Sequence, residues 1–306
     1  MGKAQLLGSD ISKHFVLKIV YLKTFRKDLG VKASQPKVLK HLTEEGIIEA
    51  ELDRGYIRRI KREYLWSIFR MVAKKISEIL SKLESLSNPE AVAGMARFGI
   101  NPKNTYGVSI PNLRKMAKEI GKDHLLAQQL WSSGIREARI IAGMIDNPEM
   151  VTEDQMESWV KDFDSWDICD QCCTNLFEKT ESAYQKCVEW SSREEEFVKR
   201  AGFVLMARLA VSDKKADDKQ FVRFLPIIKR ETTDDRNFVK KAINWALRQV
   251  GKRNTNLNKM AIKTAKEIRK TDSKTAKWIA SDAIRELKSE AVQEKLQRQK
   301  RLHTSI

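Results

Sequence analysis

The sequence predicts an all-α protein, and three observations lead to that prediction. Glycine and proline are scarce, at 13 and 6 among 306 residues, and sequences typical of tight β-hairpin turns are few. Hydrophobic residues make up 42% of the chain and charged residues 32%, a balance typical of helices that bury one face and expose the other. Similar helical segments also recur along the chain. The length allows either one large helical array or two ordinary domains.

Residues 1–70 do not share the pattern of the rest of the chain. They contain 15 basic and 8 acidic residues, with helical patterns around residues 11–29 and 37–43. The basic and aromatic segment RGYIRRIKREYLWSIFR (54–70) is compatible with contact to a phosphate backbone and equally with packing onto the main body. A third alternative, slightly favoured, is that residues 1–70 are an over-extended reading frame, since MVAKKISEILSKLESLSNPE from Met71 has the pattern of an amphipathic N-terminal helix.

From Met71 onward the pattern becomes repetitive. FVKRAGFVLMARLAV (197–211) and FVKKAINWALRQVGK (238–252) share the motif F-V-K-[RK]-A at an offset of 41 residues. The same step leads from Ala242 to Ala283 in WIASDAIRELK. Each segment has a small residue near its start and an apolar stripe at helical spacing, so each is predicted to be the equivalent helix of one repeat.

Two earlier segments, IREARIIAGMID (135–146) and WDICDQCCTNLF (166–177), continue this series at a step of about 30 residues. Periods of about 40 residues built from helix pairs are the signature of HEAT-like solenoids, whose inner helices line one concave face. The sequence therefore predicts a HEAT-like helical-repeat solenoid over residues 71–290 with a concave basic face. A basic C-terminal tail is expected over residues 291–306.

Basic residues exceed acidic ones, with 58 Lys and Arg against 41 Asp and Glu and a net charge of +17. A surplus of this size indicates a polyanionic partner, most often nucleic acid, and the alternative is a solvated basic surface. Residues 236–270 hold eleven basic side chains against one acid. If the inner helices share a face, five cations are expected to line one nucleic-acid-binding groove: Lys199, Arg200, Lys240, Lys241 and Arg248.

The sequence also excludes several classes of protein. Four cysteines are too few for a disulfide framework in a chain of this length. From the sequence we expect no signal peptide, and no apolar run is long enough to span a bilayer. We therefore expect a cytoplasmic protein, associated with the nucleoid if its source is prokaryotic, that is monomeric and needs no membrane and no cofactor. Four tryptophans fit helix-packing positions: Trp131, Trp159, Trp190 and Trp278.

The stretch DFDSWDICDQCC (162–173) combines four aspartates, a tryptophan and three of the four cysteines. A structural zinc site needs four ligands, usually as two spaced pairs. Here Cys187 stands alone and no histidine lies nearby in the sequence. On a helix, Cys169 and Cys173 fall on the apolar stripe. We expect no metal site and thiols that pack in the core.

The aspartates of this stretch divide by position. Asp164 and Asp167 have the spacing of a helix N-cap and an acid in the first turn. Trp166 and Asp170 lie four residues apart and therefore share one helix face. A carboxylate at the flank of a buried stripe needs a partner or a task. It either pairs with Lys or Arg of the next repeat, which is the commoner arrangement, or stabilises a cationic sugar and orients an attacking water.

Residues 71–290 resemble the AlkD-like DNA alkylation repair family, a family of HEAT-like glycosylases that act on alkylated purines. The resemblance rests on five segments in the same order: NPEAVAGMARFGI, LWSSGIREARIIA, SWDICDQ, FVKRAGF and FVKKAINWALRQ. No single segment is a strict fingerprint, and residues 1–70 take no part in it.

The resemblance implies roles for individual residues. The family's W-D-x-x-D motif supplies a tryptophan and a catalytic aspartate, which match Trp166 and Asp170. The arginine that contacts the DNA backbone beside the lesion matches Arg200, and a second tryptophan of the pocket matches Trp245. The family's M-A-R-[YF] segment carries Phe98 here, which keeps the aromatic face and lacks a tyrosine hydroxyl. Taken alone, Phe98 would more often be a core residue.

The implied function is a DNA glycosylase that excises N3- or N7-alkylated, positively charged purines from duplex DNA. Trp166 and Trp245 would shape the cleft, and Asp170 would stabilise the oxocarbenium ion and position water at C1′. A cationic base is already a good leaving group, so no histidine is needed to protonate it, and family members work without pulling the base into a deep pocket. The alternative function is a HEAT-like module that binds nucleic acid without catalysis.

Overall fold

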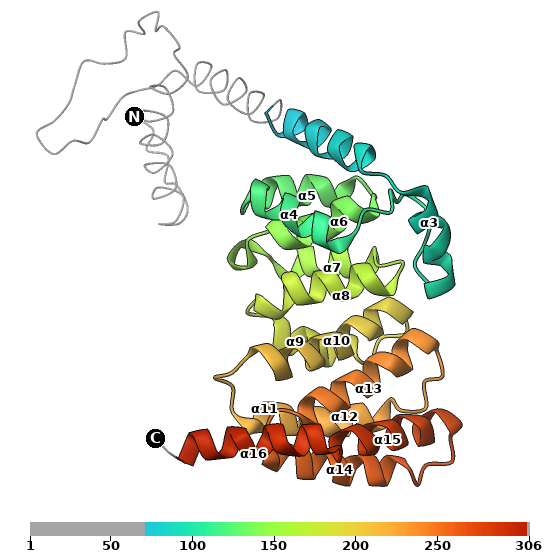
Figure 1. The fold of residues 1–306 in the computed structure, drawn as a ribbon, viewed down its shortest axis with the longest axis vertical. Helices are drawn as coiled ribbons and strands as arrows, with labels where there is room; N and C mark the ends of the chain where they lie inside the picture. The colour runs from blue at the N-terminus through green and yellow to red at the C-terminus, as the bar shows by residue number, and fades with distance from the viewer. Residues whose placement is uncertain (1–70, 305–306) are drawn as a thin grey trace, which may run out of the picture. The chain divides into compact units, whose positions relative to one another are not determined.

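The computed structural model describes residues 71–304 (Figure 1). The sequence-based interpretations of residues 1–70 lie outside the described residues. Within residues 71–304 every regular element is a helix, which confirms the all-α prediction. The amphipathic helix expected from Met71 is present over residues 71–85, with Val72, Ile79 and Leu83 buried.

Fourteen further α-helices follow along the described chain, and turns and three short 3-10 helices lie between them. The α-helices are α3 (Pro89–Met95), α4 (Ile110–Ile120), α5 (His124–Ser132), α6 (Arg136–Ile145), α7 (Glu153–Lys161), α8 (Trp166–Asn175), α9 (Ala183–Trp190), α10 (Glu196–Ser212), α11 (Asp218–Val222), α12 (Phe224–Arg230), α13 (Asn237–Gly251), α14 (Thr255–Ile268), α15 (Lys274–Leu287) and α16 (Glu290–Thr304). The 3-10 helices are η1 (Ala96–Phe98), η2 (Pro148–Met150) and η3 (Phe177–Lys179).

The helices of residues 110–287 pack as two layers. Helices α6, α8, α10, α13 and α15 contact one another in that order and form what we call the inner layer. Helices α5, α7, α9, α12 and α14 pack against this row and form the outer layer. In Figure 1 the helix pairs follow one another down the molecule from α5 and α6 to α14 and α15. Each pair therefore buries its apolar side against its neighbours, as in a repeat protein.

The repeat motif found in the sequence corresponds to equivalent helices. The two F-V-K-[RK]-A segments open α10 and α13, which make the most extensive helix–helix contact of the stack. Their phenylalanines, Phe197 and Phe238, lie with ring centroids 5.8 Å apart. Gly202 in α10 allows α9 to approach closely, because a Cβ there would lie 2.5 Å from the backbone nitrogen of Ser191. The F-V-K-[RK]-A motif thus identifies the equivalent helices of two repeats, and these helices are closely packed.

Three of the four tryptophans assigned to helix packing are buried. Trp131 stacks on Trp159 with ring centroids 4.0 Å apart, and Trp190 is fully buried. The prediction is wrong for Trp278, which is 44% exposed on α15. The buried stripe of α15 includes Ala276 and Ile279 instead, so residue 278 lies beside the stripe and not within it.

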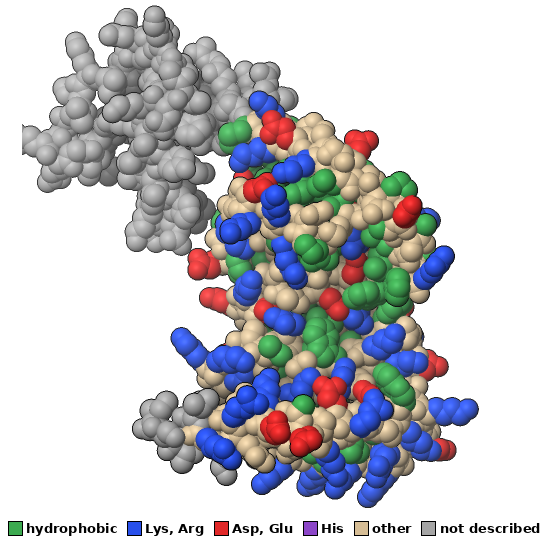
Figure 2. Space-filling model, in the orientation of Figure 1, with side chains coloured by type: hydrophobic (Ala, Val, Ile, Leu, Met, Phe, Trp, Pro, Cys, Tyr) green, Lys and Arg blue, Asp and Glu red, His purple; other side chains and the backbone are tan. Residues whose placement is uncertain are grey.

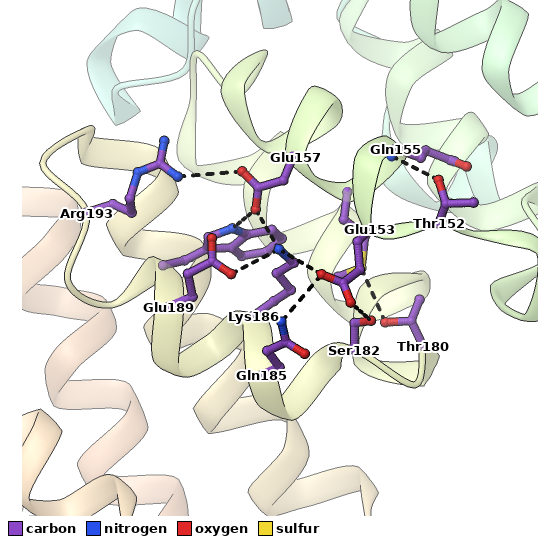
Figure 3. Close-up of polar contacts among 12 residues, drawn as sticks. Thr152, Glu153, Gln155, Glu157, Thr180, Ser182, Gln185, Lys186, Glu189 and Arg193 are labelled. Carbon is purple, nitrogen blue, oxygen red and sulfur yellow. Dashed lines mark hydrogen bonds and ion pairs between the residues drawn. The ribbon is translucent and has the colours of Figure 1, made fainter.

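The outer layer is joined partly by polar contacts. Lys186 of α9 is buried and lies within 3.3 Å of carboxylates of Glu153, Glu157 and Glu189 (Figure 3). Glu157 also accepts a hydrogen bond of 2.6 Å from the indole Nε1 of Trp190. Because a buried ammonium is stable only with such partners, this network fixes α9 on α7.

The segment for which a basic tail was expected forms α16. This helix packs on α14 and α15, and Leu296 is its buried anchor. No helix among the described residues is long and apolar enough to cross a membrane.

Candidate functional site

Helix α8, which carries Trp166 and Asp170, begins one residue later than the sequence suggested. Its N-cap is Ser165, so the prediction that Asp164 caps the helix is wrong. The carboxylate of Asp164 instead accepts a hydrogen bond of 2.7 Å from the side-chain amide of Asn101. Asp167 does lie in the first turn, where its Oδ1 accepts from the Ser165 hydroxyl at 2.7 Å.

Asp167 also anchors this turn to the preceding inner helix. Arg136, at the start of α6, donates from Nε to Oδ2 of Asp167 at 2.6 Å, and both residues are buried. The same guanidinium donates to Glu137 at 2.9 Å. Glu137 in turn accepts from the backbone N–H groups of Tyr106 and Gly107 at 3.0 Å. One buried network therefore holds the loop after Phe98 and the start of α8 in fixed relation.

The central contact of the site is an ion pair between Asp170 and Arg200 of α10, the next inner helix. Nε and the second terminal nitrogen of Arg200 donate to the two carboxylate oxygens of Asp170 at 2.9 and 2.8 Å. The remaining terminal nitrogen donates to the backbone carbonyl of Phe238 in α13 at 2.6 Å. Arg200 thus connects α8, α10 and α13, and such a bidentate arrangement is among the strongest that arginine makes.

Asp170 is nevertheless accessible. Its side chain is 18% exposed, whereas that of Arg200 is 7% exposed. Burial raises the pKa of the Asp170 carboxyl above its ordinary value, and the charge and hydrogen bonds of Arg200 act in the opposite direction. A carboxylate has about four lone-pair positions. Arg200 occupies two of them, so the others remain for a water or a substrate group.

Trp166 lies beside this ion pair. The guanidinium carbon of Arg200 is 5.9 Å from the centroid of its indole, within the range of a cation–π contact. The indole Nε1 of Trp166 donates a hydrogen bond to the backbone carbonyl of Phe98 at 2.8 Å. The Phe98 side chain is 71% exposed, so the reading of Phe98 as a core residue is wrong. Phe98 therefore contacts Trp166 through its backbone carbonyl, and its phenyl ring is exposed at the surface.

Trp245 lies further along α13. It is half-buried, packs against the core, and follows Phe238 by seven residues, or about two helical turns. Arg200 contacts the same helix at its first turn, through the backbone carbonyl of Phe238.

The five cations expected to line the groove differ in how free they are. Lys199 is 2.9 Å from Glu231 and 3.3 Å from Asp234. Arg248 pairs with Glu286, and Arg200 pairs with Asp170. Lys240 is half-buried with its ammonium 6.0 Å from the ring centroid of Trp278, and Lys241 is exposed. Only Lys240 and Lys241 of the five are therefore without a carboxylate partner among the described residues.

The cysteines are buried free thiols: Cys169, Cys172, Cys173 and Cys187. Burial raises the pKa of the Cys172 and Cys173 thiols well above the ordinary value, which keeps them neutral. Across residues 71–304 no group of histidine, cysteine, aspartate and glutamate side chains is arranged to hold a metal ion.

The positioning network of Arg136 and Glu137 was missed by the sequence analysis. The adjacent charges in LWSSGIREARIIA lie at the start of an apolar stripe, where charges are ordinarily solvated. An Arg–Glu pair that opens a strongly apolar helix could have indicated a buried pair.

Comparisons with known proteins agree with the fold. The model of a family described as DNA alkylation repair enzyme matches residues 79–287. The uncharacterized protein Lin0241 of Listeria innocua is 22% identical over 194 residues, which cover 62% of this chain and 84% of that protein. A solved structure described as "a new family of proteins related to the HEAT-like repeat DNA glycosylases with affinity for branched DNA structures" superposes with a TM-score of 0.58 at 19% identity, over 68% of this chain and 93% of the other. The similarity of fold confirms the predicted HEAT-like architecture.

Proposed function

The chain belongs to the DNA alkylation repair enzyme family, and from that premise we propose that it is a DNA glycosylase. Its proposed substrates are N3- and N7-alkylated purines in duplex DNA, which carry a positive charge. Asp170 is the proposed catalytic carboxylate.

The reaction needs little from the protein at the base itself. The bond from C1′ to the purine nitrogen breaks with its electron pair moving to the base, which loses its positive charge and leaves neutral. The sugar is left as an oxocarbenium ion. Water then adds to C1′, and its proton passes to the carboxylate or to solvent. A fixed negative charge that faces C1′ is the protein group that lowers this barrier.

The observation that carries the proposal is the geometry of Asp170. Its carboxylate is held by two hydrogen bonds from Arg200, it retains unoccupied lone pairs, and it reaches solvent. A carboxylate fixed in this way pays no reorganisation energy when charge develops on the sugar. Trp166 and Trp245 would pack against the damaged nucleotide, and the exposed ring of Phe98 offers a further stacking surface.

Contacts to the DNA backbone are proposed for the cations of the inner layer. Lys240 and Lys241 have no carboxylate partner among the described residues, so they can neutralise phosphates directly. Lys199 and Arg248 would first have to exchange their carboxylate partners for phosphate. We expect their contribution to affinity to be smaller.

A second candidate function is DNA binding without catalysis. One observation favours it: both oxygens of Asp170 already accept hydrogen bonds from Arg200, as expected of a structural ion pair. The superposed structure with affinity for branched DNA supports the same alternative.

The two functions are separated by an assay of base release. The full chain is incubated with duplex DNA that contains either N7-methylated guanine or the neutral lesion hypoxanthine at one position. The glycosylase proposal predicts release of the methylated base and little release of hypoxanthine, because only the former leaves as a neutral molecule. Tight, salt-sensitive binding with no release from the N7- or an N3-methylated duplex would establish the binding module instead.

A further inference from the structure

The outer helix α14 carries a row of lysines on one side. Lys259, Lys263 and Lys266 are spaced by four and three residues, which places them within about 60° of arc at 100° per residue. Lys270 extends the row in the turn that follows. We call these four residues the α14 stripe. All four are exposed.

The α14 stripe faces away from the rest of the stack. Leu257, Ala261 and Ala265 are among the residues that bury α14 against its neighbours. On a helical projection the buried side is centred roughly 170° from Lys259, Lys263 and Lys266. The stripe therefore lies on the opposite side of α14 from the inner layer, which carries Asp170.

The charge of the stripe is only partly offset within the described chain. No ion pair or hydrogen bond joins its four ammonium groups to a described residue. The single acid on α14, Glu267, is bound by Lys229 of α12 at 2.7 Å, and the charges of Lys263 and Lys270 help Lys229 to lower the pKa of Glu267. By contrast, Lys199 and Arg248 of the inner layer are paired with carboxylates. Figure 2 shows Lys and Arg side chains crowded over the end of the stack where Figure 1 places α14 to α16.

One straight duplex cannot reach both surfaces. Two packed helix layers are about 20 Å thick, since each helix is about 10–12 Å wide. Duplex DNA has a persistence length of about 150 base pairs, and even a bend of 40–90° spread over 20–30 base pairs costs up to several kcal/mol. A duplex on the inner layer could not turn back onto the far side of α14 within that thickness. Phosphates on the stripe must belong to a second duplex.

We propose that the α14 stripe binds the phosphate backbone of a second duplex, so that the protein holds two arms of a branched DNA at once. The match is one of charge, because four exposed ammonium groups that make no ion pair or hydrogen bond with a described residue lie in one row, as a phosphate backbone requires. The inference rests on the proposed function only in that the inner layer is assumed to hold the first duplex; it does not require catalysis.

The test uses the full chain with Lys259→Gln, Lys263→Gln and Lys266→Gln combined, since glutamine keeps helix propensity and removes charge. The matched control removes three exposed lysines that lie off the stripe, in α11 and the segment before it: Lys214, Lys215 and Lys219. Affinity is measured by fluorescence anisotropy for a synthetic four-way junction and for a linear duplex of one arm pair. The measurement is repeated over a series of salt concentrations.

We expect the stripe variant to bind the junction about tenfold or more weakly, with a salt slope smaller by about 2–3. Its affinity for the linear duplex should change less than twofold, and the control should bind both as wild type does. Unchanged junction affinity and slope would overturn the inference, and so would an equal loss for the linear duplex. Release of the methylated base from the linear duplex is measured in the same experiment. If the wild-type protein releases no base, the proposed glycosylase function is refuted, but the result for the junction still stands.

Discussion

Asp170 combines the two interpretations that the sequence left open. The ion pair expected of a structural aspartate is present, since Arg200 comes from the next inner helix. The same pair fixes a partly exposed carboxylate beside Trp166, as the proposed catalysis requires. The ion pair between Asp170 and Arg200 therefore does not decide whether Asp170 is structural or catalytic. The effect of substituting Asp170 on the rate of base release distinguishes the two roles.

Arg200 is proposed to position the carboxylate of Asp170, and this role can be tested by the pH dependence of the excision rate. Asp170 is proposed to act as a carboxylate, so the excision rate should fall as the pH drops through its pKa. In Arg200→Gln the opposing charge is lost and burial remains, so that pKa rises. The acid limb of the pH–rate profile should move to higher pH by about 1–3 units.

Arg200→Lys is the conservative partner of that experiment. It keeps the charge and loses the paired geometry, so we expect the acid limb to return toward that of wild type with a lower plateau rate. A uniform loss of rate at every pH in Arg200→Gln, with no shift of the limb, would show that Arg200 supports only the fold.

Only some features of this site could be predicted from the sequence. The shared face of Trp166 and Asp170 followed from helical spacing alone. The partner of Asp170 could not be read from the sequence, because many cations in the next repeat were compatible with it. The contact of Phe98 with Trp166 could not be predicted either, because it joins two residues that are 68 positions apart in the sequence.

At the scale of helices, close packing of α9 on α10 depends on Gly202. In Gly202→Ala the new methyl would meet the backbone of Ser191 at 2.5 Å, and backbone cannot swing aside as a side chain can. We expect a loss of about 1–3 kcal/mol in the free energy of unfolding, measured by urea denaturation.

Gly94→Ala is the matched control. Gly94 lies within α3, and a Cβ there meets nothing within 4 Å. The substitution should be neutral or stabilise by up to about 1 kcal/mol, because alanine loses less backbone entropy. Equal stability of the two variants would contradict the packing argument.

Most of the helices could be predicted from the sequence, but the layer of the stack to which each helix belongs could be predicted only in part. The inner helices repeat a recognisable motif, so α10 and α13 could be aligned before any coordinates. The basic stretch over residues 236–270 was interpreted only as a sign of nucleic-acid binding, and the structure divides its charges between α13 of the inner layer and α14 of the outer layer. A periodic pattern identifies a helix but not the side of a stack on which its charges fall.

For the whole molecule, ion pairs that cross between helices predict a loss of stability in acid. Burial would raise the pKa of Glu286, but hydrogen bonds from Lys252 and Arg248 outweigh it and lower that pKa below its ordinary value of 4.5. Burial likewise opposes the lowered pKa of Glu231, which Arg230 and Lys199 produce. A lowered pKa in the folded state stabilises the fold at higher pH, and that stability is lost as the pH falls below about 4.5.

We therefore expect the thermal midpoint to stay level between pH 6 and 7 and to fall progressively below about pH 4.5. Differential scanning calorimetry at fixed ionic strength measures this directly. The double variant Glu231→Gln and Glu286→Gln should show a shallower decline. An identical slope in the double variant would mean that other carboxylates dominate.

One measurement tests most directly whether Asp170 performs the proposed catalysis. Single-turnover release of N7-methylguanine from a duplex is compared for wild type, Asp170→Asn and Asp164→Asn. Asp164 is the matched control, because it lies in the same segment but is exposed, and its carboxylate accepts a hydrogen bond from Asn101 and not from an arginine of the described chain. We expect Asp170→Asn to be slower by about 10²–10³-fold with duplex affinity preserved, and Asp164→Asn to match wild type. Release by Asp170→Asn at the wild-type rate would contradict a catalytic role for Asp170.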